Sequence, residues 1–250
     1  MHLTWHFGAG DIAALRNIVA AHEGSALLHD RRSRNLSAVK SAVSRERFWR
    51  ALCMGLLTTQ QPSGPSSSVA RLLATQPFPL AHTELLRAQD PEAHATQLLV
   101  RYRGIRRHGR IGSELAENLS LLEGGEWLPL LSALGKLAAP VDAMVERDVA
   151  DYLDDRFKGL GPKQARNVLQ ALGLTRYEIP LDSRLAKWLR SVSFPVPVGA
   201  SALADRAYYC FVLDALHRLC QEADIFPCEL DAAVFASYDA DEWTPQLVVF

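Results

Sequence analysis

The sequence contains an amine and a carboxylate that could act together on one carbon atom. Lys163 follows a Gly-x-Gly-Pro turn, and Asp182 stands 19 positions later, directly after a Pro-Leu pair. A lysine is a nucleophile only as the neutral amine, so this chemistry requires surroundings that lower the pKa of Lys163. A nearby carboxylate can accept a proton from the amine and stabilise positive charge on the carbon. Taken singly, the two residues are better explained as a solvated lysine and a helix N-cap.

Residues 157–169 indicate the structure that carries Lys163. They read Phe-Lys-Gly-Leu-Gly-Pro-Lys-Gln-Ala-Arg-Asn-Val-Leu, so that one helix ends at the glycines and the next begins at Pro162. The glycines permit a tight reversal, and unpaired backbone N–H groups at the new helix start suit a phosphate oxygen. Ala165 is small enough for the two helices to approach closely. The segment predicts a helix-hairpin-helix that would hold the backbone of DNA without reading its bases.

Together these motifs resemble the helix-hairpin-helix, Gly/Pro-loop, Asp (HhH-GPD) superfamily of base-excision-repair DNA glycosylases. The family hairpin reads Gly-h-Gly-x-Lys-x-Ala, where h is apolar; residues 159–165 match it, and residues 180–182 match the Pro-h-Asp that follows. The resemblance covers roughly residues 44–190. It implies that Lys163 and Asp182 are catalytic. It also implies that the hairpin contacts DNA through Gly159, Leu160, Gly161 and Gln164.

Two further residues match the family by position. The segment Leu56-Leu57-Thr58-Thr59-Gln60 resembles the family's Leu-Ser-x-Gln turn, whose polar side chain fills the gap that a displaced nucleotide leaves. Gln60 is therefore the expected wedge. Arg184 lies two residues after Asp182, where the 8-oxoguanine enzymes place a basic residue near the phosphate of the displaced nucleotide.

The resemblance implies a reaction on double-stranded DNA that contains a damaged base. The base would leave the helix and enter a pocket, because a stacked base cannot be reached. Lys163 would attack C1′ with help from Asp182, and the resulting imine would allow elimination of the 3′ phosphate. The expected activities are thus those of a DNA glycosylase and an abasic-site (AP) lyase, which are hydrolase and lyase reactions.

The damaged base is expected to be 8-oxoguanine, since the chain looks most like the compact bacterial and archaeal 8-oxoguanine glycosylase/lyases. Removal of oxidised pyrimidines, as by endonuclease III, is the first alternative. A glycosylase in which Asp182 activates water is another, and a non-catalytic DNA-binding module is a third. Aromatic side chains that could stack on a displaced base, although most are expected in the core, include Trp188, Tyr208, Tyr209, Phe211 and Trp243.

No cofactor is expected, although a monovalent cation could bind at the hairpin. The cysteines are Cys53, Cys210, Cys220 and Cys228, without a C-x-x-C pair. They lack both the number and the spacing of the four-cysteine iron–sulfur loop that endonuclease III carries. They also do not indicate a zinc site or a disulfide framework, and free buried thiols are the expectation.

Charge is distributed unevenly along the 250 residues, whose net charge is −1. Residues 1–110 hold 15 Lys and Arg against 7 Asp and Glu, whereas residues 111–250 hold 12 against 21. One basic group comprises Arg31, Arg32 and Arg34, and a second comprises Arg101, Arg103, Arg106, Arg107 and Arg110. Either group could contact phosphates, but solvated helix faces are the simpler interpretation.

Apolar residues recur at helical spacing almost throughout, which predicts an all-α fold of two helical lobes with a DNA-binding cleft between them. Helices are expected at residues 11–22, 66–73, 90–102, 111–122, 126–134, 141–157, 201–223 and 226–236, with a basic loop through Arg34. Three more are expected: one whose inner stripe runs from Phe48 to Leu56, one that begins at Pro162, and one that the chain enters at residues 179–184. We expect residues 1–250 to form a single unit. Its core is 44–190, and the terminal segments 1–43 and 191–250 complete the second lobe.

Hydrophobic residues make up 48% of the chain and charged residues 22%, a balance typical of a globular protein. No apolar run is long enough to span a bilayer, and the first ten residues do not resemble a signal peptide. The expectation is a cytoplasmic, nucleoid-associated monomer without a membrane partner. The apolar tail, residues 247–250, is expected to pack against the body.

Overall fold

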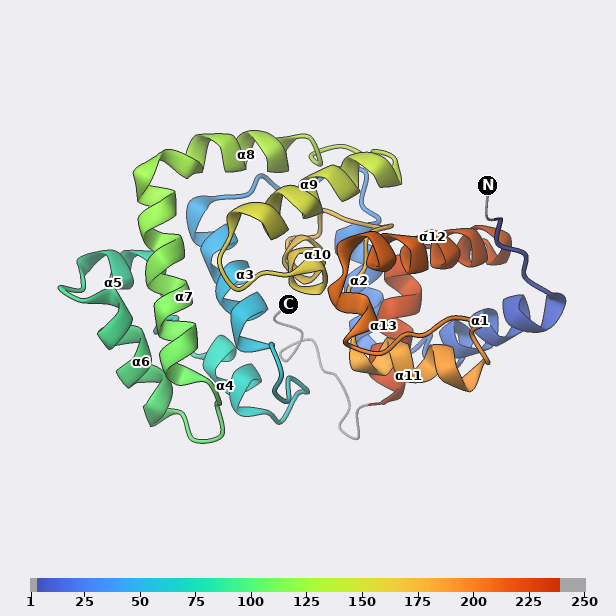
Figure 1. Cartoon of the computed structure of the whole chain (residues 1–250), viewed down its shortest axis with the longest axis horizontal. Helices are drawn as coiled ribbons and strands as arrows, with labels where there is room; N and C mark the ends of the chain where they lie inside the picture. The colour runs from blue at the N-terminus through green and yellow to red at the C-terminus, as the bar shows by residue number, and fades with distance from the viewer. Residues whose placement is uncertain (1–3, 239–250) are drawn as a thin grey trace.

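The computed structural model describes residues 4–238, and the part it describes is entirely helical apart from turns and loops (Figure 1). In chain order the elements are α1 (Ala9–Ala21), α2 (Ala26–Asn35), α3 (Arg45–Leu57), α4 (Ser68–Ala74), α5 (His82–Arg87), α6 (Pro91–Arg101), α7 (His108–Leu121), the π-turn η1 (Leu122–Glu126), α8 (Trp127–Gly135), α9 (Ala143–Arg156), α10 (Pro162–Ala171), α11 (Ser183–Ser191), the 3₁₀ turn η2 (Ala202–Ala204), α12 (Arg206–Ala223) and α13 (Pro227–Ser237). The all-α expectation is confirmed for these residues.

The helices pack around two hydrophobic cores. The first core is built from residues between Phe48 and Leu174, and the second joins residues 15–28 to residues 179–234. In Figure 1, helices α4 to α8 lie on one side of the molecule and α1, α11 and α12 on the other, with α10 between them. The chain passes from the first core to the second between Leu174 and Ile179, a few residues before Asp182. Whether the two parts act as one unit, as expected from the sequence, stays a prediction.

Helix α3 forms the centre of the first core and packs against α10. Nearly all its side chains from Phe48 onward are buried. At the point of closest approach the helix carries Gly55, where an added Cβ would lie 3.0 Å from Cγ2 of Val168 and 3.4 Å from Cδ2 of Leu160. A side chain at this position would push the hairpin helix outward. The lack of a side chain at Gly55 therefore allows α10 to pack closely against α3.

The structure corrects the expected basic loop through Arg34, because residues 26–35 form α2. The charge of this segment suggested solvent exposure, but its arginines form ion pairs within the protein. Arg31 donates to Asp231 at 2.9 Å, and Arg32 donates to Glu229 at 2.7 Å. Both partners belong to α13, so the pairing is invisible in the local sequence. The first basic group thus stabilises the second lobe.

Helix α5 was not predicted either. It spans only His82–Arg87, which is too short for a helical repeat of apolar residues to appear in the sequence. The other expected helices are present, and their ends differ from the prediction by a few residues. Among residues 4–238 no helix is both long and apolar enough to cross a membrane. The tail at 247–250 lies outside the described residues.

The connection from α10 to α11 is held by two buried carboxylates. Glu146 of α9 accepts hydrogen bonds from the Thr175 hydroxyl at 2.5 Å and from three backbone N–H groups, those of residues 176, 177 and 178, at 2.8 to 3.0 Å. Glu178 in turn accepts from Arg166 of α10 at 2.6 Å and from Arg147 of α9 at 2.9 Å. Neither carboxylate is more than 1% exposed. This network determines where the chain enters the Asp182 segment.

Glu146→Gln should lower the free energy of unfolding by about 2 to 3 kcal/mol, because an amide NH₂ would face backbone donors that lose a charged acceptor. Chemical denaturation monitored by circular dichroism measures this change. Glu117→Gln is the matched control, since Glu117 is 52% exposed and should change stability by no more than about 0.5 kcal/mol. Equal stability of the two variants would contradict the role given to Glu146.

Candidate active site

Lys163 and Asp182 line one small cavity of about 60 Å³ between the starts of α10 and α11. Its wall is formed by Leu27, Arg31, Met54, Thr58, Ser63, Asn167, Gln170, Pro180, Asp231 and Phe235. The amine and the carboxylate come from different helices, and the two cores meet around them. The fold therefore brings together the two side chains whose joint chemistry the sequence indicates.

The surroundings of Lys163 favour its neutral form. Burial lowers the pKa of the Lys163 amine, while the nearby carboxylates of Asp182 and Asp231 oppose this effect and Arg184 adds to it. The result is a pKa below that of an ordinary lysine. A larger fraction of the amine is then unprotonated near neutral pH, as a nucleophile requires.

Asp182 is a helix cap and a wall of the cavity at the same time. Its Oδ1 accepts hydrogen bonds from the backbone N–H groups of Arg184 and Leu185, at 2.8 and 2.9 Å, which caps α11. Its Oδ2 lies 3.4 Å from Nη1 of Arg184. The cap holds the carboxylate in one orientation, and the side chain retains 12% exposure. The structural and the chemical interpretations of Asp182 are therefore compatible.

Arg184 lies beside Asp182, next to the cavity. Its guanidinium carbon is 3.9 Å from the centroid of the Phe235 ring, and Phe235 lines the cavity from α13. The guanidinium thus has an aromatic face on one side and a carboxylate on the other. The role of Arg184 at a phosphate stays a prediction.

Asp231 of α13 is a residue of this site that sequence reasoning missed. It is 4% exposed, and its Oδ2 accepts hydrogen bonds from Arg31 at 2.9 Å and from Gln170 at 2.6 Å. Burial raises the pKa of Asp231 to about 7, against the opposing charge of Arg31. The only signal in the sequence was a carboxylate among apolar residues of the helix expected at 226–236.

The described aromatic residues that the sequence offered for stacking on a base, among them Tyr209, do not line this cavity. Trp188 is 5% exposed in the second core, Tyr208 donates to the Pro197 carbonyl at 2.8 Å, and Phe211 packs against Trp5. None of these three lines the cavity beside the amine. Trp243 lies outside the described residues. The aromatic ring that the structure does place at this cavity is Phe235.

The hairpin between α9 and α10 has the predicted form. Gly159 has a φ of 80°, and the neighbouring Lys158 is bound through its backbone N–H and carbonyl by the Asn118 side chain, at 2.8 and 2.9 Å. Gly161 precedes α10 with extended backbone, and no side chain caps the helix start there. Among residues 4–238, no side chain accepts a hydrogen bond from the N–H groups of that first turn, which is the arrangement suited to a phosphate oxygen.

Two of the hairpin residues expected to contact DNA are buried. Leu160 is 6% exposed and packs toward α3, and Gln164 is 5% exposed and donates to the Thr59 hydroxyl. Gln164 thus ties the hairpin helix to the loop that follows α3. Their contact with DNA stays a prediction, and the contacts observed here are internal.

The loop after α3 presents Gln60 to solvent. Gln60 has a φ of 57°, a conformation that few residues other than glycine adopt, and its side chain is exposed. The loop is held on both sides of this residue: Arg107 donates to the Thr59 carbonyl at 3.4 Å, and the Arg106 backbone N–H donates to the Gln61 side chain at 2.7 Å. Two arginines of the second basic group therefore brace the expected wedge.

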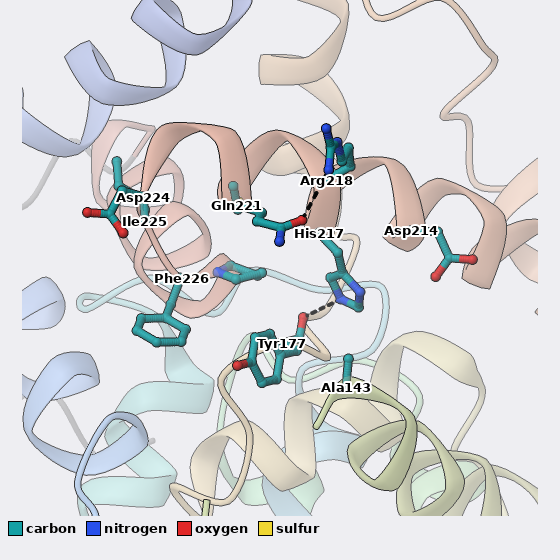
Figure 2. A pocket seen from close by; sticks show the side chains of 11 residues that line it. Ala143, Tyr177, Asp214, His217, Arg218, Gln221, Asp224, Ile225 and Phe226 are labelled. Carbon is teal, nitrogen blue, oxygen red and sulfur yellow. Dashed lines mark hydrogen bonds between the residues drawn. The ribbon is translucent and has the colours of Figure 1, made fainter. Parts of the chain in front are cut away.

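A larger pocket lies beside α12 and the start of α13. It measures about 480 Å³, and Figure 2 shows Tyr177, His217 and Phe226 among its lining residues. Nε2 of His217 is 2.9 Å from the Tyr177 carbonyl oxygen, the contact drawn as a dashed line in Figure 2. The pocket offers no lysine and does not contain Asp182. The smaller cavity is therefore the candidate active site, because it contains Lys163 and Asp182.

The cysteines are free thiols, with Cys210 partly buried and the other three buried. Within residues 4–238 no group of three or more His, Cys, Asp or Glu side chains is arranged to hold a metal ion.

The fold is similar to that of several 8-oxoguanine DNA glycosylases of known structure. The enzyme of Methanocaldococcus jannaschii is 15% identical and superposes with a TM-score of 0.67 over 92% of this chain and 95% of its own. The enzyme of Thermotoga maritima is 13% identical, with a TM-score of 0.67 over 93% of this chain and 98% of its own.

A further structure is the Methanocaldococcus jannaschii 8-oxoguanine glycosylase/lyase in complex with 15mer DNA containing 8-oxoguanine. It is 13% identical and has a TM-score of 0.64 over 91% of this chain and 98% of its own. No protein-family model and no curated protein matches the sequence. At such low identity the likeness shows that the chain has the fold of these enzymes over almost its whole length.

The two hairpin glycines should differ sharply when replaced by alanine. At Gly159, with φ of 80°, the new Cβ would lie 2.6 Å from Cδ of Glu114 and 2.7 Å from Cδ2 of Leu56. Gly159→Ala should therefore cost about 2 to 4 kcal/mol of stability. At Gly161 the Cβ would meet nothing within 4 Å, so Gly161→Ala should leave stability unchanged within about 0.5 kcal/mol.

Thermal and denaturant unfolding of the two variants measure this contrast. If a phosphate binds at the start of α10, Gly161→Ala should also weaken binding to duplex DNA, since the methyl group would occupy the approach. A Gly159→Ala protein as stable as the parent would show that the hairpin is not packed as described.

Proposed function

We propose that this protein is a DNA glycosylase with AP lyase activity that removes an oxidised base, 8-oxoguanine, from double-stranded DNA. The observation that carries the proposal is that a lysine of lowered pKa, on the first turn of the hairpin helix, and the carboxylate that caps the next helix line the same cavity. The fold shared with 8-oxoguanine DNA glycosylases supports it.

DNA would bind across the hairpin and the loop after α3. The uncapped start of α10 would hold a phosphate, and Gln60 would enter the helix where the damaged nucleotide leaves. The cavity of about 60 Å³ is far smaller than the roughly 300–1,000 Å³ typical of small-molecule pockets, so it must widen to admit a base. Ser63 belongs both to this loop and to the cavity wall, and a shift of the loop would therefore open the cavity.

The reaction would begin with attack of Nζ of Lys163 on C1′. The bond between C1′ and the base breaks, and its electron pair leaves with the base, which is then protonated. Asp182 stabilises the positive charge on C1′ during this step and accepts a proton from the attacking amine. The sugar ring then opens to an imine between C1′ and Nζ.

The imine would next permit strand cleavage. It withdraws electrons from C2′, so that loss of a C2′ proton expels the 3′ phosphate. Hydrolysis of the imine regenerates Lys163. None of these steps requires a metal ion or an organic cofactor, and we propose that the enzyme works without one.

Asp231 and Phe235 support a purine as the displaced base. Both hydrogen bonds that Asp231 accepts fall on Oδ2, and its Oδ1 accepts none from the described residues. A guanine-type base presents adjacent N–H donors on its pairing edge, which one carboxylate can bind, whereas an oxidised thymine presents a single donor there. The ring of Phe235, which carries the Arg184 guanidinium, adds an aromatic wall to the cavity. In the cell we place the enzyme in the cytoplasm on nucleoid DNA, acting as a monomer.

Borohydride reduction of a mixture with abasic-site duplex should trap a covalent protein–DNA adduct. Lys163→Gln should abolish the adduct, because the imine nitrogen is lost. Asp182→Asn should slow its formation by about 10²- to 10⁴-fold. Lys136→Gln, at an exposed position, should leave it unchanged. Electrophoresis of the reduced mixture measures the adduct.

An adduct that persists in Lys163→Gln would assign the chemistry to another amine. Complete absence of an adduct with the unaltered protein, together with tight binding to DNA, would favour the non-catalytic module. Release of a base from lesion DNA without strand cleavage would favour a glycosylase in which Asp182 activates water.

Duplexes that contain 8-oxoguanine should be cut faster than duplexes that contain thymine glycol, by at least about 10-fold, since a missing hydrogen bond to a buried carboxylate is costly. Single-turnover cleavage of labelled duplexes measures both rates. Asp231→Asn should reduce the difference, because its amide can accept only one of the two N–H donors. Preferential cutting at thymine glycol would overturn the choice of base.

A further inference from the structure

The hydroxyl group of Tyr209 bridges the backbone on either side of Pro180, immediately before Asp182. It accepts a hydrogen bond from the Leu181 N–H at 2.6 Å and donates one to the Ile179 carbonyl at 3.0 Å. Tyr209 is completely buried and comes from α12, which packs in the second core. A single side chain thus holds both ends of the Ile179–Leu181 segment.

The side chains of this segment are buried in the second core, but its backbone makes few other hydrogen bonds within the described residues. Pro180 has no N–H group, and within the part of the chain that the structure describes, the one backbone–backbone hydrogen bond to this segment runs from the Asp182 N–H to the Pro180 carbonyl, at 2.9 Å. Pro180 itself lines the cavity that contains Lys163. The hydroxyl of Tyr209 therefore adds two hydrogen bonds to the backbone directly before Asp182.

The ring of Tyr209 is connected to the lysine-bearing helix as well. The guanidinium carbon of Arg166 lies 4.9 Å from the ring centroid. Arg166 is three residues beyond Lys163 on α10, and it also donates to the Pro162 carbonyl at 3.0 Å and to Glu178 at 2.6 Å. Tyr209 thus contacts α10, which carries Lys163, through its ring, and the segment before Asp182 through its hydroxyl.

We propose that Tyr209 is a positioning residue, whose hydroxyl fixes the Pro180 segment so that the Asp182 carboxylate stays opposite Lys163. Its effect on the reaction rests on the proposed function. Tyr209 touches neither the cavity nor DNA in this arrangement and acts only through Asp182. A buried tyrosine that merely satisfies two backbone groups would contribute to stability alone.

Tyr209→Phe removes the hydroxyl and keeps the ring, so the core and the stack with Arg166 are preserved. The rate of borohydride trapping on abasic-site duplex should fall by about 10- to 100-fold, because Asp182 is displaced, while affinity for the duplex is retained. In the Asp182→Asn background, Tyr209→Phe should cause no further loss, since the carboxylate it positions is already gone.

Tyr152→Phe is the matched control. The Tyr152 hydroxyl donates to Glu126 at 2.6 Å beside the first core, whereas Tyr209 lies in the second, so its loss should reduce stability without changing the trapping rate. A rate for Tyr209→Phe equal to that of the unaltered protein would overturn the proposal. So would an equal slowing in both backgrounds, which is the signature of a general structural role.

A second measurement does not require activity. With ¹³C-labelled lysine, NMR titration reports the pKa of Lys163, whose resonance is assigned by its absence in Lys163→Gln. Asp182 raises this pKa, so it should fall in Tyr209→Phe and should not respond to Tyr209→Phe once Asp182→Asn is present. If the unaltered protein forms no adduct, the proposed function fails. An unchanged titration in Tyr209→Phe would still overturn the positioning role by itself.

Discussion

The arrangement of the candidate site depends on how the chain between α10 and α11 is held. Glu146 binds four donors of residues 175–178, and Glu178 is paired with Arg166 and Arg147. Because these carboxylates are buried, their hydrogen bonds are protected from competition with water, and the loss of any partner would leave a charge uncompensated. The network therefore fixes the path of the chain from the lysine-bearing helix to the Asp182 segment, and the two cores pack on either side of it.

The site is built from groups that are unfavourable to bury. Lys163 is partly buried and the carboxylate of Asp231 is buried, and their pKa values shift toward the neutral forms. Such groups lower stability and are tolerated where surrounding structure holds them in place. Here the support comes from the cap that Asp182 forms on α11 and from the bonds of Arg31 and Gln170 to Asp231. The same burial that lowers stability also lowers the pKa of Lys163, on which its proposed reactivity depends.

Similarity to known structures at 13–15% identity also has a physical explanation. Packing of helices requires apolar residues of suitable volume at the right positions, and many combinations satisfy this requirement. A hairpin turn with φ of 80° at Gly159 and no room for a Cβ is much less tolerant. The hairpin turn therefore restricts its residues more strongly than the packing of helices does.

The sequence by itself determined the helical fold, the hairpin and the pair of Lys163 and Asp182, because each depends on local rules: helical periodicity, glycine at a tight turn, and a residue interval. It did not indicate α2 or Asp231, and it offered Tyr209 only as a ring that could stack on a base. The charges of α2 suggested a solvated loop, because their partners on α13 are distant in the sequence. Asp231 and Tyr209 likewise stand 49 and 27 positions after Asp182 in the chain. Their contacts arise only when the second core forms, since a hydrogen bond between distant segments leaves no periodic trace in either one.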